Sequence, residues 1–559
     1  MKFLFVAVNS KYIHSNPAVR ILREYALSHD PSIPEEEIGI LESTINHPYE
    51  EILSGICEQK PEVVLLSCYI WNWNVMRRLA KDLAVCLPEA DLWAGGPEVS
   101  FETEKVLREN PWLTGIMQGE GEESFLKLAQ SYLCGEPLSG ILAGGETRME
   151  ELPFIYEEES LDLFRNKILY YESSRGCPFS CSYCLSSISR HVRIRPWEKV
   201  EKELDFFYRA KVKQVKFVDR TFNCDHVHCQ KILQWILAHD NGVTNYHFEI
   251  AGDLLNEEEI ALLSKMRPGQ VQLEIGVQTT NPEVVREIRR TMDLPKLKKN
   301  VALIRKGKNV HQHLDLIAGL PLEDMESFRR SFDEVYAMRP DQLQLGFLKV
   351  LKGSYMAEKA KDYGIRYQED APYEVLSTQW MTPDDILRLK EVEDVLEIFF
   401  NSHQFTATMR ILETCFDSAF AMYAAMSLFF AEKGYDLHGP SRLSRYQYLL
   451  EFAFITDPQQ ADLWKEALTF DYYLREKAKK RPPFATDRKP YEKQIRKLPQ
   501  EGLSNRSYVD LYRYAVWEKK PEKLDAPAFV AFDYDHPDPL ENNAQIRIIG
   551  YLQEEHHLL

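Results

Sequence analysis

Three cysteines in the middle of the chain, Cys177, Cys181 and Cys184, have the spacing C-x3-C-x2-C. The first lies between a glycine and a proline, and an aromatic residue, Tyr183, stands just before the last. Thiolates are ligands for soft transition metals, and three of them on one short loop can hold three corners of an iron–sulfur cube. The fourth iron would then have no protein ligand and would be open to a small molecule.

Other interpretations of these cysteines are open. A ferredoxin-type cluster needs four thiolates, and no fourth cysteine is close by in the sequence. Structural zinc sites usually combine two C-x2-C or histidine pairs, which this segment lacks. Three unrelated thiols would need no particular spacing. The spacing, the glycine, the proline and the aromatic residue together favour an iron–sulfur cluster with one open iron.

The motif resembles the signature of the radical S-adenosylmethionine (SAM) enzymes, C-x3-C-x-aromatic-C. The resemblance implies a [4Fe-4S] cluster on Cys177, Cys181 and Cys184 whose open iron binds the amino and carboxylate groups of SAM. One electron from the cluster would split the sulfonium and yield a 5′-deoxyadenosyl radical. The resemblance also implies a reductant such as flavodoxin or ferredoxin.

Composition narrows the class of protein. With 559 residues, of which 44% are apolar, the chain is long enough for about three or four domains with large cores. A net charge of −18 argues against a broad nucleic-acid-binding surface, because contacts with phosphates need clustered Lys and Arg. No apolar run approaches the length of a membrane span. Ten cysteines without a paired framework, together with the thiolate motif, predict a reducing cytoplasm.

Residues 1–150 alternate short apolar runs with amphipathic segments. This pattern predicts a doubly wound parallel sheet in which helices cover both faces. Glycine-rich turns follow the last two predicted strands, where the backbone of such a sheet can approach a ligand closely. The predicted strands are 2–8, 38–41, 62–67, 91–94 and 115–118.

This region resembles the cobalamin-binding Rossmann-like domain that precedes the radical domain in one class of radical SAM enzymes. The usual cobalamin motif D-x-H-x-x-G is absent, and His14 in the first loop lacks the flanking Asp and Gly. We therefore expect cobalamin without a histidine ligand. The alternative is a domain kept for packing or substrate docking. The resemblance implies cobalamin contacts from Ser67, Tyr69, Gly95, Gly96, Pro97, Glu98, Gly119, Glu120 and Gly121.

Residues 151–360 repeat a strand-then-helix unit about six times, which predicts a partial parallel barrel. Functional groups in such barrels gather at the carboxyl ends of the strands, where polar residues fall in this sequence. Cys224 and Cys229 follow the second strand, and we expect a helix cap there rather than a second metal site. The predicted strands are 167–172, 214–218, 247–250, 270–277, 313–318 and 342–348.

The radical SAM resemblance assigns roles to the ends of these strands. A ribose diol and an ammonium group need carboxylate or amide acceptors, and an adenine needs a close, flat backbone. The alternative for Glu249 and Glu274 is a structural pairing with Arg or Lys inside the barrel. The residues that the resemblance places near SAM are Tyr183, Asp219, Glu249, Glu274, Gln278, Ile317 and Gly319.

Three arginines after the cysteine motif form a basic segment. They could contact a carboxylate or phosphate of a substrate, or they could form a solvated face, which is the commoner role of such a segment. They are Arg190, Arg193 and Arg195.

Residues 361–559 show mainly helical periodicity and resemble an uncharacterised domain appended to cobalamin-type radical SAM proteins. We expect this domain to close the open side of the barrel and to shape the substrate pocket. The basic stretch 475–497 is interpreted as a solvated loop or a site for an acidic partner. The predicted helices are 384–400, 409–430, 445–454 and 461–473, and a strand pair is predicted at 528–534 and 545–551.

Two cofactor-like domains in tandem predict a cobalamin-dependent radical SAM methyltransferase. The radical would remove hydrogen from an unactivated carbon, and methylcobalamin would deliver the methyl group. Alternatives are a cyclase or rearrangement enzyme without methyl transfer, a transfer-RNA methylthiotransferase, and a non-catalytic binding protein on the same scaffold. The substrate, a small molecule or a peptide, and the catalytic residue are not specified by the sequence.

Overall fold

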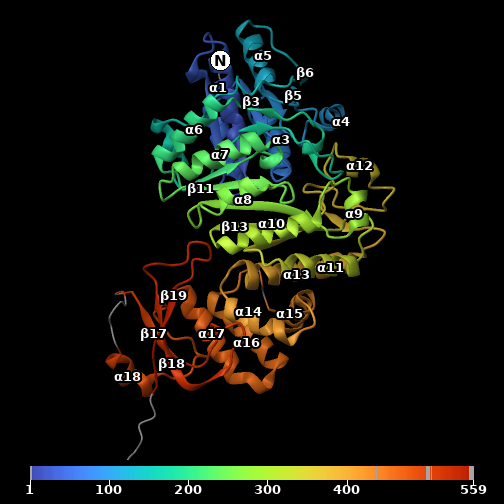
Figure 1. Ribbon diagram of the computed structural model, residues 1–559. Helices are drawn as coiled ribbons and strands as arrows, with labels where there is room; N and C mark the ends of the chain where they lie inside the picture. The colour runs from blue at the N-terminus through green and yellow to red at the C-terminus, as the bar shows by residue number, and fades with distance from the viewer. Residues whose placement is uncertain (1–2, 436, 438, 499–503, 505, 553–559) are drawn as a thin grey trace, which may run out of the picture.

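The computed structural model describes residues 3–435, 437, 439–498, 504 and 506–552. An amino-terminal sheet lies at one end, a second sheet wrapped by helices lies in the middle, and a mainly helical carboxyl-terminal part lies at the other end (Figure 1). This arrangement confirms the predicted fold class.

The amino-terminal sheet has the strand order β2-β1-β3-β4-β5-β6, and all its neighbouring strands are parallel. Helices cover both faces, because one core contains residues of α2 and α3 and the other contains residues of α1 and α5. All five predicted strands are present, and the short edge strand β6 was not predicted. The elements are β1 (Phe3–Asn9), α1 (Pro17–His29), β2 (Ile38–Thr44), α2 (Tyr49–Gln59), β3 (Val63–Ser67), α3 (Trp73–Cys86), β4 (Asp91–Gly95), α4 (Thr103–Glu109), β5 (Gly115–Gln118), α5 (Glu122–Leu133) and β6 (Gly140–Ala143).

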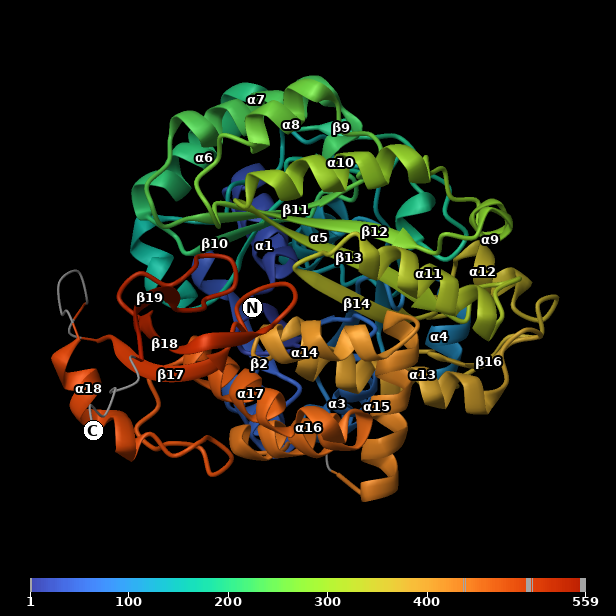
Figure 2. The ribbon, with the colours of Figure 1, turned by 60° about the horizontal axis from the view of Figure 1, so that its bottom comes forward.

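The central sheet has the order β14-β13-β12-β11-β10-β7 and is also parallel throughout. Helices α6, α7, α8, α10 and α11 form an arc outside these strands (Figure 2). The six predicted strands are confirmed as a partial barrel. Its strands and following helices are β7 (Leu169–Tyr171), α6 (Trp197–Ala210), β10 (Gln214–Phe217), α7 (His226–Ala238), β11 (Asn245–Ile250), α8 (Glu257–Leu263), β12 (Val271–Gln278), α9 (Pro282–Glu287), α10 (Leu294–Gly307), β13 (Val310–Ala318), α11 (Met325–Ala337) and β14 (Gln342–Phe347).

Side chains along β12 alternate between fully buried and partly accessible positions. The buried set faces the helices, so the accessible set, which includes Glu274 and Gln278, lines the polar inside of the barrel. The cap predicted between the two cysteines after the second strand is confirmed: the Asp225 side chain accepts a hydrogen bond from the His228 backbone N–H and begins α7.

The carboxyl-terminal part combines helices with an antiparallel sheet of order β17-β18-β19. The side chain of Asn401 both donates to and accepts from the backbone of Leu343, at 2.9 Å each, and so covers part of the β14 edge. The elements are α12 (Tyr355–Lys359), β15 (Arg366–Tyr367), β16 (Val375–Ser377), α13 (Pro383–Leu396), α14 (Thr406–Leu412), α15 (Ala419–Lys433), α16 (Arg442–Thr456), α17 (Ala461–Arg475), α18 (Glu492–Lys497), β17 (Tyr508–Tyr514), β18 (Lys523–Asp533) and β19 (Gln545–Tyr551).

One prediction for this part was wrong. The single helix at 409–430 is instead α14 and α15, which bend by 104° at a break where the Ser418 side chain caps α15. In the basic stretch 475–497, Lys479, Lys480 and Lys489 are exposed, as expected of a solvated loop, whereas Arg481 lies 2.5 Å from the buried carboxylate of Asp510. That aspartate lies on β17, a strand that was not predicted.

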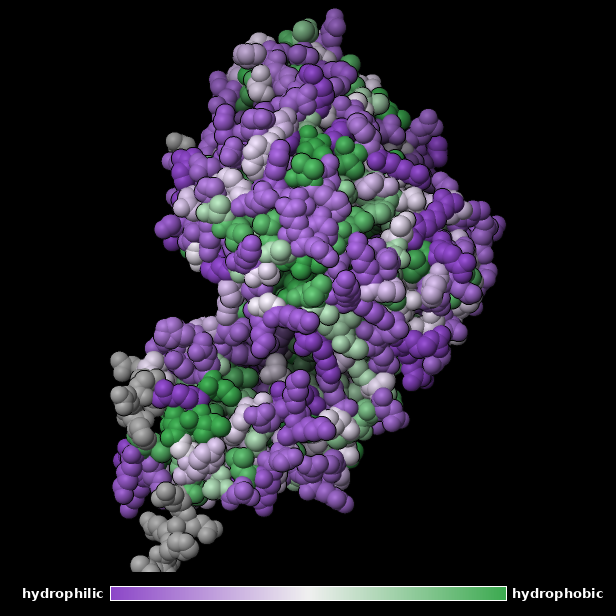
Figure 3. Space-filling model, in the orientation of Figure 1, coloured by the Kyte–Doolittle hydropathy of each residue, from purple (hydrophilic) through white to green (hydrophobic). Residues whose placement is uncertain are grey.

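The surface of the carboxyl-terminal part includes an apolar patch over the three-stranded sheet (Figure 3). Strand β19 exposes Ile546, Ile548 and Tyr551 there. Within the described residues, no individual helix has the length and apolar character needed to cross a membrane. The bent pair Thr406–Cys415 and Ala419–Lys433 reaches that length and composition only when its two helices are taken together.

Candidate functional site

A cavity of about 770 Å³ lies between the carboxyl ends of the two parallel sheets. The strands of both sheets therefore direct their last residues and following loops into one space, which is where parallel sheets bind ligands. The described residues from 361 onward contribute nothing to its lining. The carboxyl-terminal part instead packs beside β14, on the open side of the barrel that it was expected to close, and its expected role in shaping the substrate pocket stays a prediction.

The amino-terminal wall of the cavity consists of loops that follow β3, β4 and β5. Gly96 has a φ of +114°, and a Cβ atom there would lie 2.4 Å from the carbonyl oxygen of Cys68. Only glycine allows the two loops to approach so closely. The loops include most of the residues that the sequence assigned to cobalamin, namely Ser67, Tyr69, Gly95, Gly96, Pro97, Gly119, Glu120 and Gly121.

Glu98 is the exception in this set. It is 6% exposed and does not line the cavity. Its carboxylate accepts hydrogen bonds from Lys352, at 2.8 Å, and from the Tyr373 hydroxyl. Glu98 therefore joins the loop after β4 to the segments that follow β14.

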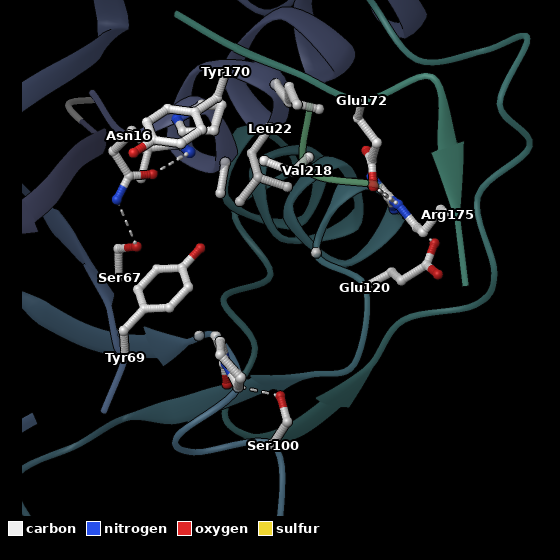
Figure 4. A pocket seen from close by; sticks show the side chains of 18 of the residues that line it. Asn16, Leu22, Ser67, Tyr69, Ser100, Glu120, Tyr170, Glu172, Arg175 and Val218 are labelled. Atoms are coloured by element: carbon white, nitrogen blue, oxygen red, sulfur yellow. Dashed lines mark hydrogen bonds and ion pairs between the residues drawn. The ribbon is translucent and has the colours of Figure 1, made fainter. Parts of the chain in front are cut away.

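Ser100 and Tyr69 complete this wall. The Ser100 hydroxyl donates to the Gly96 carbonyl at 2.9 Å and accepts from the Gly119 N–H at 3.2 Å, so it fastens two glycine loops together. The Tyr69 ring stacks on Trp71 with centroids 4.3 Å apart and points into the cavity (Figure 4). These contacts preorganise the wall before any ligand binds.

His14 also lines the cavity. Its Nδ1 lies 2.5 Å from the hydroxyl of Tyr170, which comes from strand β7 of the barrel. Burial lowers the pKa of His14, and the nearby charges of Lys11 and Lys216 lower it further, so the imidazole is neutral at pH 7. The loop after β1 is thus tied to the barrel at the edge of the cavity.

Residues on either side of the three cysteines form the opposite wall, namely Ser174, Arg175, Gly176, Leu185, Ser186 and Ser189, whereas the cysteines themselves lie behind this lining. Cys177 and Cys181 are buried, Cys184 is half-buried, and all three are free thiols. Burial raises the pKa of Cys181, and the charge of Arg290 offsets part of this rise. The Cys184 N–H donates to the Cys181 carbonyl at 3.2 Å, so these two cysteines share one tight turn. Among the described residues, no three His, Cys, Asp or Glu side chains converge on a site for a single metal ion.

Backbone contacts hold this loop in place. Gly176 has a φ of +103°, and a Cβ atom there would meet the His191 carbonyl oxygen at 2.3 Å. The Cys177 N–H donates to the Ser189 carbonyl at 3.1 Å. The Ser182 N–H donates to the Ile288 carbonyl at 2.9 Å. The three thiols therefore sit on a fixed loop, and their donor set fits an iron–sulfur cluster.

Arg175 connects the two walls (Figure 4). Its guanidinium lies 2.9 Å from Glu120, 2.9 Å from Glu122 and 2.7 Å from Glu172. Burial alone would raise the pKa of Glu120, but Arg193 and Arg175 hold it below its usual value. A network of this kind fixes the loop after β5 against the residues just before the first cysteine.

The basic segment after the cysteines is largely internal. Arg193 forms an ion pair with Glu120, and Arg195 is 3% exposed and pairs with Glu203 at 2.8 Å. The solvated face was therefore wrong for these two arginines, while the alternative of a substrate contact stays a prediction, with neither side chain in the lining of the cavity. Arg190 is exposed.

The residues predicted near SAM separate into two groups. Glu249 lines the cavity beside Lys216, at 3.7 Å. Glu274 lies opposite Glu249 on the next strand, 3.1 Å from Lys216 and 2.9 Å from His247. Burial would raise the pKa of Glu274, but the hydrogen bond from His247 and the charge of Lys216 lower it to about 2.

Glu274 and the other predicted SAM residues do not line the cavity. Asp219 is fully buried and accepts hydrogen bonds from the Ser173 N–H and from the hydroxyls of Ser173 and Ser174, at 2.6–2.9 Å. Burial raises the pKa of Asp219 to about 7. Gly319 would bring a Cβ atom to 2.8 Å from Val375 of β16. Tyr183, Gln278 and Ile317 lie near the ends of the cysteine loop, β12 and β13.

Sequence reasoning missed several residues of the site. Tyr170 and Arg175 have no local signal, because their partners His14 and Glu120 lie far away in the chain. Arg290 was also missed: its Nη1 lies 3.9 Å from the Cys181 sulfur.

Three family models match successive parts of the chain. The B12 binding domain matches residues 4–129, the Radical SAM superfamily matches 171–335, and a protein family of unknown function (DUF4080) matches 361–544. The chain carries a B12-binding domain followed by a radical SAM domain. The cavity lies between these two domains.

Curated relatives and solved structures resemble this radical SAM protein. The cobalamin-dependent radical SAM methyltransferase TokK of Streptomyces tokunonensis is 25% identical over 60% of this chain and 54% of the relative. An anaerobic magnesium-protoporphyrin IX monomethyl ester cyclase of Synechocystis is 23% identical over 56% of this chain and 66% of the relative. The chain spans about half the length of TokK.

Two solved structures share the fold. The cobalamin-dependent SAM radical enzyme OxsB has a TM-score of 0.57 and 13% identity, covering 85% of this chain and 79% of OxsB. The radical SAM methyltransferase TsrM of Kitasatospora setae has a TM-score of 0.55 and 15% identity, covering 69% of this chain and 84% of TsrM.

Proposed function

We propose that this chain is a cobalamin-dependent radical SAM methyltransferase that methylates an unactivated carbon of a small molecule or peptide. The observation that carries the proposal is the single cavity between Gly96, Gly119 and Gly121 on one side and Gly176 and Leu185 of the cysteine loop on the other. Two reactive cofactors must face the same substrate in such an enzyme, and this cavity borders both candidate sites.

In this proposal, Cys177, Cys181 and Cys184 hold a [4Fe-4S] cluster, and the glycine loops hold cobalamin. The thiol donor set and the bare backbone at Gly96 fit these groups. When bound, the cluster and SAM supply a 5′-deoxyadenosyl radical, and cobalamin supplies a methyl group. The chain itself binds and orients the groups and keeps water out.

Several residues other than the cysteines and the glycine loops support this arrangement of the two cofactor sites. Glu249 and Lys216 face the cavity and can accept from, or donate to, polar groups of SAM or substrate. Asp219, held by Ser173 and Ser174, fixes the strand that enters the cysteine loop. Glu98 does not line the cavity. Its hydrogen bond from Lys352 anchors the loop after β4, which is one of the proposed cobalamin loops.

The experiment uses protein reconstituted without oxygen with iron, sulfide and hydroxocobalamin. SAM with a deuterated methyl group and titanium(III) citrate are added, and cobalamin is analysed by mass spectrometry. We expect labelled methylcobalamin with one S-adenosylhomocysteine for each methyl group, and separately 5′-deoxyadenosine. No substrate is needed. Unlabelled cobalamin in protein that forms 5′-deoxyadenosine would reject methyl transfer.

A cyclase or rearrangement enzyme is the second candidate, and the likeness to the Synechocystis cyclase favours it over a non-catalytic protein. Such an enzyme would form 5′-deoxyadenosine from SAM without S-adenosylhomocysteine. The labelling experiment therefore distinguishes the two functions.

We also propose an acidic electron carrier, such as a flavodoxin, as the reductant. Arg286 and Arg289 are exposed on the segment that contacts the cysteine loop through Ile288. The segment continues into α10, which exposes Lys296 and Lys299. In a chain with a net charge of −18, this basic surface beside the cysteines suits an acidic partner.

Two further parts of the proposal concern the whole chain. The ten free cysteines suit a reducing compartment, and we propose the cytoplasm. We propose domain boundaries near residues 150 and 360, which give the segments 1–150, 151–360 and 361–559.

A further inference from the structure

Arg290 lies beside the cysteine loop, on the segment after α9. Its Nη1 is 3.9 Å from the Cys181 sulfur and 3.3 Å from the Tyr183 hydroxyl. Its Nη2 donates to the carbonyl of Gly276 on β12. The guanidinium is therefore held by a strand end on one side and directed at the middle cysteine on the other.

Gly276 makes room for this arrangement. A Cβ atom at this position would lie 3.4 Å from Nη2 of Arg290 and 2.3 Å from the side-chain nitrogen of Gln278. The absence of a side chain on β12 thus lets the guanidinium reach the carbonyl and point toward the loop. These contacts fix the position of the Arg290 guanidinium, so Arg290 is not a flexible surface side chain.

The charge of Arg290 has no carboxylate partner among the described residues, where no ion pair of 4 Å or less is found for it. Arg175, in contrast, touches three carboxylates. The Nε of Arg290 is buried and has no hydrogen-bond partner in the same part of the chain. A sheltered cation needs a compensating anion, and the nearest candidate is the thiolate of Cys181.

We propose that Arg290 donates a hydrogen bond to the Cys181 thiolate and raises the reduction potential of the cluster. This inference rests on the proposed cluster at the three cysteines. Reduction adds one negative charge to the cluster, so a nearby cation and a hydrogen bond to sulfur stabilise the reduced form more than the oxidised form. Arg290 is thus a positioning residue that makes the cluster easier to reduce.

The test compares the reduction potential of the reconstituted cluster in four proteins, with and without SAM, by a redox titration followed by electron paramagnetic resonance. The variants are Arg290→Met, which removes the charge, and Arg290→Lys, which keeps it on a single donor group. Arg330→Met is the matched control, because Arg330 is exposed on α11 and pairs with Glu326 at 3.4 Å instead. Iron content and the absorption spectrum establish that each cluster is intact.

We expect the potential to fall from the wild type to Arg290→Lys and further to Arg290→Met, with Arg330→Met unchanged. An intact cluster with the wild-type potential in Arg290→Met would overturn the inference. A weaker affinity for SAM with no change in potential would also overturn it and would assign Arg290 to SAM binding. If Arg290→Met assembles no cluster, Arg290→Lys decides, and a wild-type potential there rejects the inference.

The failure of the inference is distinguishable from the failure of the proposed function. Wild-type protein without iron would reject the cluster and with it the proposed function. Wild-type protein with a full cluster whose potential does not depend on Arg290 would reject the inference alone.

Discussion

Arg175 and Glu120 join the two walls of the cavity, with Nη1 of the arginine 2.9 Å from Oε2 of the glutamate. The arginine stands two residues before the first cysteine of the motif, and the glutamate lies in the glycine-rich loop after β5. Arg193 approaches the same carboxylate from the other side. The distance between the two candidate cofactor sites is therefore set by an ion-pair network and not by flexible loops.

Replacing Arg175 with methionine removes the centre of this network. Glu122, whose side chain is 5% exposed, would lose its partner, and we expect a loss of about 2–4 kcal/mol in the free energy of unfolding. Chemical denaturation checks this value. Arg148→Met is the control, because Arg148 is exposed in its pair with Glu151, and we expect little change in the free energy of unfolding. Equal effects of the two substitutions would contradict the network's role.

Gly96→Ala tests the cobalamin cradle. A Cβ atom would meet the Cys68 carbonyl at 2.4 Å, and the φ of +114° alone costs about 1–3 kcal/mol for a non-glycine residue. We expect a lower cobalt content after reconstitution. Gly135→Ala is the control: its φ is +74°, but the space around it is open. Full cobalt binding by Gly96→Ala would show that the loop after β4 does not hold the cofactor.

The buried carboxyl of Asp219 predicts a pH dependence of stability. Burial raises its pKa to about 7 in the folded protein, whereas the unfolded chain has a value of about 4. Between these values the folded state binds the additional proton, so its stability falls as the pH rises, by up to about 1.4 kcal/mol per pH unit from this group. Asp219→Asn should remove this contribution. Chemical denaturation of the wild type and of Asp219→Asn at pH 5 and pH 7.5 measures this contribution. An equal loss of unfolding free energy in both proteins between the two pH values would contradict the raised pKa of Asp219.

The basic surface beside the cysteines, which includes Arg286 and Lys299, predicts that an acidic reductant binds by charge attraction. Arg286→Glu and Lys299→Glu should slow cluster reduction by a flavodoxin at low salt and weaken its dependence on ionic strength. Reduction by dithionite should not change. Lys202→Glu, an exposed lysine on α6, serves as the control. Stopped-flow absorption gives the rates, and an unchanged flavodoxin rate would place the docking surface elsewhere.

The sequence predicts those parts of the site that depend on local pattern. Cysteine spacing and glycines after strands are local features, because a tight turn or a close backbone approach requires a particular residue at a particular place. Apolar runs and turns are local too, so the strands of both parallel sheets can be predicted, apart from the short edge strand β6. The loops that wall the cavity follow from the ends of those strands.

Long-range side-chain pairs could not be predicted in this way. Glu98 looks like part of a ligand loop, but its partner Lys352 lies 254 residues away. Arg193 meets Glu120 across 73 residues, so its buried position has no sign in the local sequence. The break before Ser418 is also hidden, because apolar residues continue at helical spacing on both sides of it.

A metal count on wild-type protein tests the central claim, that one cavity serves two cofactors. Protein reconstituted without oxygen with iron, sulfide and hydroxocobalamin is desalted, and iron and cobalt per chain are measured together with the absorption spectrum. The account predicts four irons and one cobalt per chain, with iron lost in Cys181→Ala and cobalt retained there. Wild-type protein that binds iron but no cobalt would contradict it.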